Sequence, residues 1–152
     1  MSIAMALHLL GVIVWVGGMF FAHMVMRPVF NSALEPEERV PLLLGVFNHF
    51  FPWVWGSVIA ILASGFWMLF VIYENGIGLW LGFMTVIGVL MSAIFVYIYS
   101  MPYNRLGAAV KNQDKPKVVL AVIQIRRLIL VNLILGLSVT LVAILGKYGL
   151  MH

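Results

Sequence analysis

The chain has 152 residues, of which 64% are hydrophobic and only 9% are charged, and its formal net charge at pH 7 is +4. Roughly a quarter of the residues in soluble domains are charged, so this composition excludes an ordinary soluble enzyme and indicates a single membrane domain over residues 1–152. The sequence has no cysteine, which excludes disulfides, iron–sulfur clusters and thiolate metal ligands.

Four stretches of the sequence are apolar enough to cross a membrane, at about residues 3–27, 48–72, 77–100 and 126–146. Each has roughly the 17–25 residues that a spanning helix needs, and a helix satisfies its own backbone hydrogen bonds in lipid. The polar residues 73–76 predict a tight turn that joins the second and third spans as a hairpin. We therefore predict an all-α fold, a polytopic membrane protein built as an antiparallel four-transmembrane-helix bundle.

Two segments connect the remaining spans. Residues 31–47 contain Glu35-Pro36-Glu37-Glu38-Arg39 followed by spaced apolar residues, which is typical of an amphipathic helix lying on the membrane surface. Residues 101–117 are polar and basic, and we expect a loop there. The sequence thus predicts a short amphipathic segment between helices 1 and 2 and a basic loop between helices 3 and 4.

Nearly all basic residues lie on one side of the predicted bundle. Eight of the nine Lys and Arg residues flank these two connections: Arg27, Arg39, Arg105, Lys111, Lys115, Lys117, Arg126 and Arg127. Cytoplasmic loops carry the excess of Lys and Arg in membrane proteins. We therefore predict that the amphipathic segment and the basic loop are cytoplasmic and that both termini lie on the opposite side.

The first span carries two ionisable side chains, His8 and His23, and such residues within a span are functional-site candidates by default. At 3.6 residues per turn, Trp15 lies about 20° around the helix from His8 and about 10 Å further along, and His23 about 60° and 22 Å. One broad face thus presents all three residues. On the outer side, Met68 or Met84 could supply a soft partner for His8. The alternative interpretation is that His8 is hydrogen-bonded packing and His23 an interfacial anchor.

A second group of candidates lies near the cytoplasmic side. The first span ends in His23-Met24-Val25-Met26, and His49 enters the second span from the same side. Imidazole with thioether ligands suits soft Cu(I), whereas imidazole alone suits Cu(II) or haem iron. We therefore predict His23, Met24, Met26 and His49 as a candidate metal site. No acidic residue lies within a span, which argues against a site for hard cations.

The stretch Ala6-Leu7-His8, followed by Trp15-Val16-Gly17-Gly18, resembles the first helix of the CopD family, bacterial inner-membrane proteins associated with copper handling. This resemblance implies a protein of the bacterial inner (cytoplasmic) membrane that takes part in copper import or tolerance. Together with the charge distribution, it places both termini in the periplasm.

The chain is also similar to the related four-helix HemJ family, named for a late step of haem synthesis. The similarity includes Glu35-Pro36-Glu37-Glu38-Arg39, Gly65-Phe66-Trp67-Met68-Leu69 and Tyr103-Asn104-Arg105-Leu106. It implies a b-type haem bound by the first-helix histidine, here His8. HemJ-like proteins also carry a basic residue in the third helix, whereas this chain has only uncharged residues at 80–86, which argues against protoporphyrinogen oxidase activity.

The first hypothesis is a CopD-like protein that binds or passes copper through His8 on the outer side and the His23, Met24, Met26 and His49 cluster on the inner side. The alternative is a b-type haem-binding redox protein, with His8 or the His23–His49 pair as axial ligands. For either cofactor, Trp15 is a further candidate binding residue. A third hypothesis is a cofactor-free assembly partner. The expected partners are the lipid bilayer and a metal ion or haem, with no nucleic acid. Gly78-Leu-Trp-Leu-Gly82, a small-xxx-small pattern, also allows a homodimer.

Overall fold

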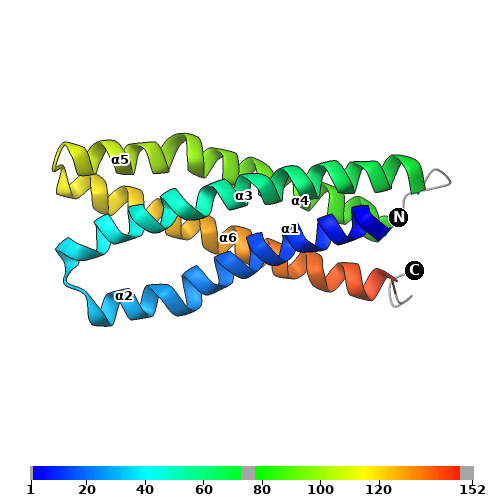
Figure 1. Ribbon diagram of the computed structural model, residues 1–152, viewed down its shortest axis with the longest axis horizontal. Coiled ribbons are helices and arrows are strands. Elements are labelled where there is room, and N and C mark those ends of the chain that lie inside the picture. Colours follow the sequence, from blue (N-terminus) through cyan, green and yellow to red (C-terminus); the bar gives the residue numbers. More distant parts are fainter. Residues whose placement is uncertain (1, 73–77, 148–152) are drawn as a thin grey trace.

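The computed structural model describes residues 2–72 and 78–147, and all regular structure within these ranges is helical. In chain order the helices are α1 (Ser2–Phe21), the π-helix η1 (Ala22–Met26), α2 (Arg27–Ala33), α3 (Pro36–Ile72), α4 (Leu79–Ile98), the π-helix η2 (Tyr99–Tyr103), α5 (Asn104–Lys111) and α6 (Lys115–Lys147). Because the chain continues without a break through both π-helices, these helices form four long antiparallel rods (Figure 1). All four rods are long and apolar enough to cross a membrane, which confirms the predicted fold.

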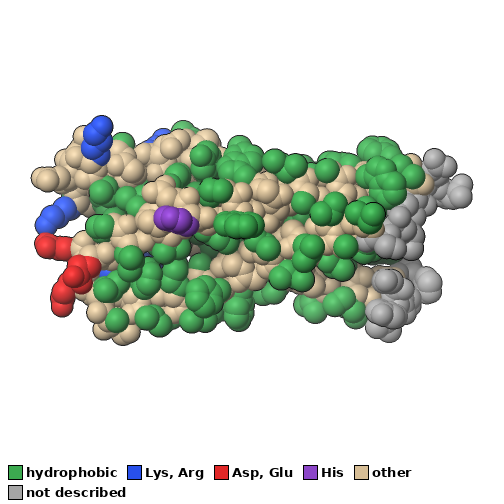
Figure 2. Space-filling view, viewed as in Figure 1, with side chains coloured by type: hydrophobic (Ala, Val, Ile, Leu, Met, Phe, Trp, Pro, Cys, Tyr) green, Lys and Arg blue, Asp and Glu red, His purple; other side chains and the backbone are tan. Residues whose placement is uncertain are grey.

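The two ends of the bundle differ in charge. α1 begins and α6 ends at the same end, which we call the terminal end (Figure 1). Charged side chains gather at the opposite end, the basic end, where α2 leads into α3 and α5 into α6, whereas apolar side chains cover much of the remaining surface (Figure 2). α3 has 37 residues and is therefore about 55 Å long, well beyond the ~30 Å of a hydrocarbon core. That the basic end faces the cytoplasm stays a prediction.

Between α1 and α3 the structure differs from the sequence-based expectation. Residues 31–47 do not form a separate surface helix, because α3 begins at Pro36 and continues unbroken towards the terminal end. The turn is short because Arg39 stabilises it. Its Nε donates to the carbonyl oxygen of Leu34 and its Nη2 to that of Asn31, both at 2.8 Å. These carbonyls lie at the C-terminal end of α2, where a cation is favourable.

The expected basic loop over residues 101–117 is also mostly helical. α5 continues α4 as far as Lys111, and α6 begins at Lys115, after a turn of three residues. Packing explains the difference, because α5 lies against α6, and Leu106 of α5 and Ile125 of α6 are fully buried. Asp114 caps α6 by accepting from the backbone N–H of Lys117 at 3.2 Å.

The two π-helices lie at similar depths along their rods. α1 and α4 each have 20 residues, so η1 and η2 both begin about 30 Å from the terminal end. Pro28 is the second residue after η1, and Pro102 lies within η2. Proline lacks a backbone N–H and its ring clashes with the carbonyl one turn earlier, so the helix widens locally to relieve both problems. Both irregularities therefore lie about one hydrocarbon thickness from the terminal end.

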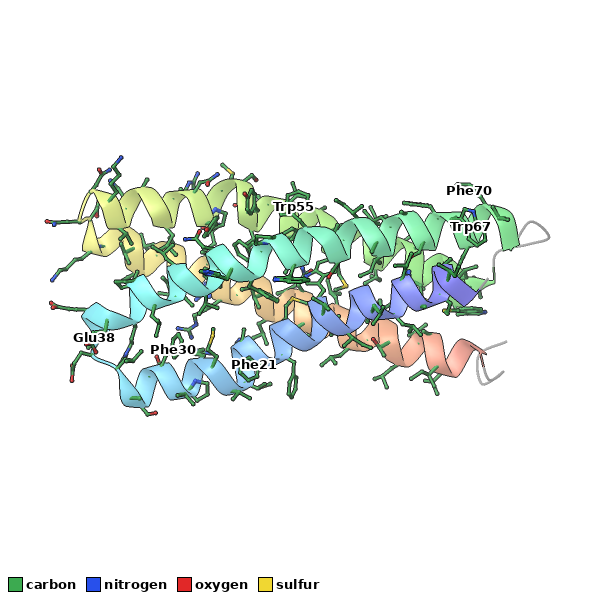
Figure 3. All side chains as sticks on the ribbon, in the orientation of Figure 1. Phe21, Phe30, Glu38, Trp55, Trp67 and Phe70 are labelled. Carbon is green, nitrogen blue, oxygen red and sulfur yellow. The ribbon has the colours of Figure 1, made fainter. Side chains whose placement is uncertain are left out.

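Aromatic rings fill the space between α3 and the rod formed by α4 and η2. The ring centroid of Phe51 lies 4.8 Å from that of Tyr103 and 5.7 Å from that of Phe95. Trp55 of α3, labelled in Figure 3, meets Phe95 at 5.2 Å, and Trp15 of α1 meets the same ring at 6.1 Å. The backbones of α1 and α3 approach more closely. A Cβ at Gly11 would lie only 2.8 Å from Cγ1 of Ile61, so glycine is required there.

Replacing Gly11 tests this contact. We expect Gly11→Ala to lower the free energy of unfolding by about 1–3 kcal/mol, because the added methyl group overpacks α1 against α3. Gly17→Ala is the matched control on the same helix, since a Cβ there meets no atom within 4 Å and alanine favours helix. Thermal unfolding of the purified protein in detergent measures both. Equal loss in the two variants would contradict the close approach of α1 and α3.

Candidate functional site

His8 is held against α3 by two hydrogen-bonding contacts. Its half-buried ring places Nδ1 at 3.2 Å from the carbonyl oxygen of Ile61 and at 3.1 Å from Oγ of Ser64. A carbonyl oxygen only accepts hydrogen bonds, so the contact with Ile61 assigns the proton to Nδ1. The hydroxyl of Ser64 donates to the carbonyl of Ala60, which leaves its oxygen free to accept from the same N–H.

This tautomer determines what the other ring nitrogen can do. With the proton on Nδ1, Nε2 of the neutral imidazole carries a lone pair and neither contact with α3 uses it. Histidine ligands of metals commonly have this arrangement, in which a backbone carbonyl or carboxylate holds the second nitrogen and orients the ring. A Cβ at Gly65 would lie 3.3 Å from Cε1 of His8, so the missing side chain leaves room for the ring.

His23 belongs to η1 and lines a cavity of about 270 Å³ near the basic end. Arg27 of α2, Arg39 of α3 and Arg126 of α6 also line this cavity, and none of the described lining residues is acidic. In the described part of the chain, Nε of Arg27 and Nε of Arg126 are buried without a hydrogen-bond partner. We call this space the basic cavity. Its positive charge favours an anion and disfavours a metal cation.

The other members of the predicted inner cluster are placed differently. Met26 lines the basic cavity with His23, whereas the side chain of Met24 is 53% exposed. His49 is also exposed, and its Nδ1 donates to the carbonyl one turn earlier in its own helix, at 2.8 Å. Phe47 lines the cavity, and His49, two residues later, lies about 200° further around α3. The structure thus brings together His23 and Met26, but not Met24 or His49.

Trp15 lines an apolar cavity of about 170 Å³. This apolar cavity adjoins the basic cavity on the side of the terminal end. The two cavities share four lining residues, Ala22, Met26, Phe47 and Ile129. Asn132 of α6 also lines the apolar cavity and is only 1% exposed. Its Nδ2 donates to the carbonyl of Met91 at 3.1 Å, but its Oδ1 has no partner among the described residues. The interior is therefore amphipathic, with arginines at one end and apolar side chains beyond them.

Sequence reasoning missed part of this interior. It did not predict that Arg27, Arg39 and Arg126 line one cavity, because their convergence depends on how three different helices pack. It also gave no role to Asn132. A signal existed for that residue, since a polar amide in the middle of the fourth apolar stretch is costly in a membrane.

The protein is an integral membrane protein with four helices long and apolar enough to cross a membrane. Its helical bundle contains polar groups, namely the hydrogen-bonded imidazole of His8 and the arginines that line the basic cavity. The CopD family model, copper resistance protein D, matches residues 44–145, which is more than half of the chain. The chain therefore belongs to the CopD family, as the resemblance of its first helix indicated. The matched residues include His49 and Asn132 but begin beyond His8 and His23. Comparisons with curated proteins and with solved structures find no match.

The unpaired oxygen of Asn132 leads to a stability prediction. We expect Asn132→Leu to preserve or raise the thermal stability of the ligand-free protein, because an unpaired buried acceptor costs about 1–3 kcal/mol. The carbonyl of Met91 loses little, since it lies within the hydrogen-bonded helix α4. Asn132→Ala is the control that leaves a void and should lower the unfolding temperature. If the leucine variant unfolded at as low a temperature as the alanine variant, the prediction would be contradicted. The stabilisation from the bond between Asn132 and the carbonyl of Met91 would then exceed the cost of burying the unpaired oxygen.

Proposed function

We propose that this protein binds and passes copper within the membrane and that His8 is a copper ligand in the half of the bundle nearer the terminal end. Membership of the CopD family makes it a membrane protein of the copper-resistance class, which supports copper as the cargo. The observation that carries the role of His8 is the bond from its Nδ1 to the carbonyl of Ile61. This bond orients the ring and leaves Nε2 as the donor atom.

Methionines near His8 supply the soft ligands that Cu(I) prefers. Met68 lies four residues after Ser64 and therefore on the same face of α3, where it is half-buried. Met5 lies three residues before His8 on α1 and is 37% exposed. Within residues 2–72 and 78–147 there is no group of three or more His, Asp or Glu side chains that could hold a metal ion. One imidazole with thioethers is thus the set of ligands that supports copper here, and it favours Cu(I) over hard cations.

The proposal does not extend to the predicted inner cluster. His23 shares its cavity with three arginines, and their positive charge opposes the binding of a copper cation. Met24 and His49 are exposed and do not line that cavity. The family comparison supports copper and gives no support to the haem alternative.

A competition titration tests the role of His8. We expect His8→Ala to lower the Cu(I) affinity of the purified protein at least tenfold, because it removes the donor atom itself, and Ser64→Ala to lower it by a smaller factor. Removing an outer-shell partner of a metal ligand typically costs about 10- to 100-fold in affinity. A chromophoric Cu(I) chelator competing with the detergent-solubilised protein gives the dissociation constants.

His49→Ala is the matched control, because it removes an exposed imidazole whose Nδ1 is bonded to the carbonyl of Gly45 in the same helix. It should leave the Cu(I) affinity unchanged. An unchanged affinity in a folded His8→Ala variant would refute the proposal and favour the packing interpretation. A Soret band in the purified protein that disappears in His8→Ala would instead assign His8 to haem.

A further inference from the structure

We propose that the basic cavity binds the phosphate of an anionic phospholipid, with an acyl chain entering the adjoining apolar cavity. The proposal does not depend on copper, because it uses Arg27, Arg126 and Arg39 near the basic end, whereas the copper proposal uses His8 in the other half of the bundle.

The arginines of this cavity lack an anionic partner within the described part of the chain. The two ion pairs found there join Lys115 to Glu37 at 3.7 Å and Lys117 to Asp114 at 2.7 Å, and neither involves an arginine. Buried guanidinium nitrogens without partners are costly, and Nε of Arg27 and Nε of Arg126 are both in this state. An anion between α2 and α6 would satisfy both nitrogens.

Guanidinium groups match phosphate especially well, because their planar fork donates two parallel hydrogen bonds to two phosphate oxygens. Arg39 is already held in place by its bonds to the carbonyls of Leu34 and Asn31. It therefore lines the cavity without losing further side-chain freedom when an anion arrives. Three cations from α2, α3 and α6 thus converge on one space with no carboxylate among its described lining residues.

The depth of the cavity favours a lipid as the source of the phosphate. Arg27 follows η1 directly, and Arg126 lies 21 residues before the end of α6 at Lys147. At 1.5 Å per residue, both arginines lie roughly 30–38 Å from the terminal end. A hydrocarbon core is about 30 Å thick, so the arginines lie at the level of the lipid phosphates when the terminal end is at the opposite surface. Basic pockets between helices at this level bind anionic head groups.

The adjoining apolar cavity suits an acyl chain. It shares the lining residues Ala22, Met26, Phe47 and Ile129 with the basic cavity, so it adjoins the arginines on the side of the hydrocarbon core. Phe30, labelled in Figure 3, lines the basic cavity from α2 together with Val40 and Leu43 of α3. A polar group at one end and apolar surfaces beyond it match the two parts of one phospholipid molecule.

Native mass spectrometry of the full chain in detergent tests this proposal. With phosphatidylglycerol and phosphatidylcholine of identical acyl chains, we expect phosphatidylglycerol to bind about tenfold more tightly, because the arginines repel the choline cation. Arg27→Gln and Arg126→Gln should each remove most of this preference. Arg127→Gln is the matched control, since Arg127 is exposed and does not line the cavity, and it should keep the preference.

Equal binding of the two lipids by the unaltered protein would overturn the proposal, and so would an equal loss in Arg126→Gln and Arg127→Gln. The unaltered protein and Arg27→Gln decide the question even if Arg126→Gln does not fold. Millimolar inorganic phosphate should not displace phosphatidylglycerol. Displacement would show that the cavity takes free phosphate and would overturn the assignment to a lipid.

Discussion

A polar group in hydrocarbon has no water to bind, so each one carried into this bundle requires a partner within the chain or within a ligand. Most hydroxyl groups find that partner in their own helix. Six of them donate to the carbonyl four residues earlier: Ser57, Ser64, Thr85, Ser92, Ser138 and Thr140. His8 and Asn132 instead reach across to neighbouring helices, His8 from α1 to α3 and Asn132 from α6 to α4.

The same constraint makes the exceptions informative. Within the described residues, three buried side-chain atoms lack a partner: Nε of Arg27, Nε of Arg126 and Oδ1 of Asn132. All three residues line the two contiguous cavities. Buried polar atoms in proteins nearly always have a hydrogen-bond partner, so a buried atom without one calls for an explanation. A bound ligand that supplies the missing hydrogen bond is such an explanation. The accumulation of these atoms around two adjoining cavities is therefore the strongest physical reason to regard these cavities as a binding site.

Charge divides the bundle into two regions with different chemistry. Near the terminal end, His8 lies on α1, and residues Ser2–Phe21 of this helix include no Lys or Arg that would repel a soft metal cation. Near the basic end, three arginines share one cavity and favour anions. Coulomb repulsion in a low-dielectric interior is strong over short distances. His8 and the three arginines lie in opposite halves of the bundle. This separation allows a cation site and an anion site in one small protein.

Hydropathy and charge follow from residues taken one after another, so the sequence by itself determined the four spanning helices, the basic end and His8 as an ionisable group within a span. It did not determine how far the helices extend, because residues 36–47 and 104–111 are helical through packing against neighbours as well as through apolar length. Only the tertiary structure decided which side chains meet. His8 bonds to Ile61, His49 faces outwards, and Arg126 shares a cavity with Arg27, because these contacts depend on the rotation and register of each rod. Glycine contacts and ring packing between helices set that register, and the periodicity of a single helix carries no information about it.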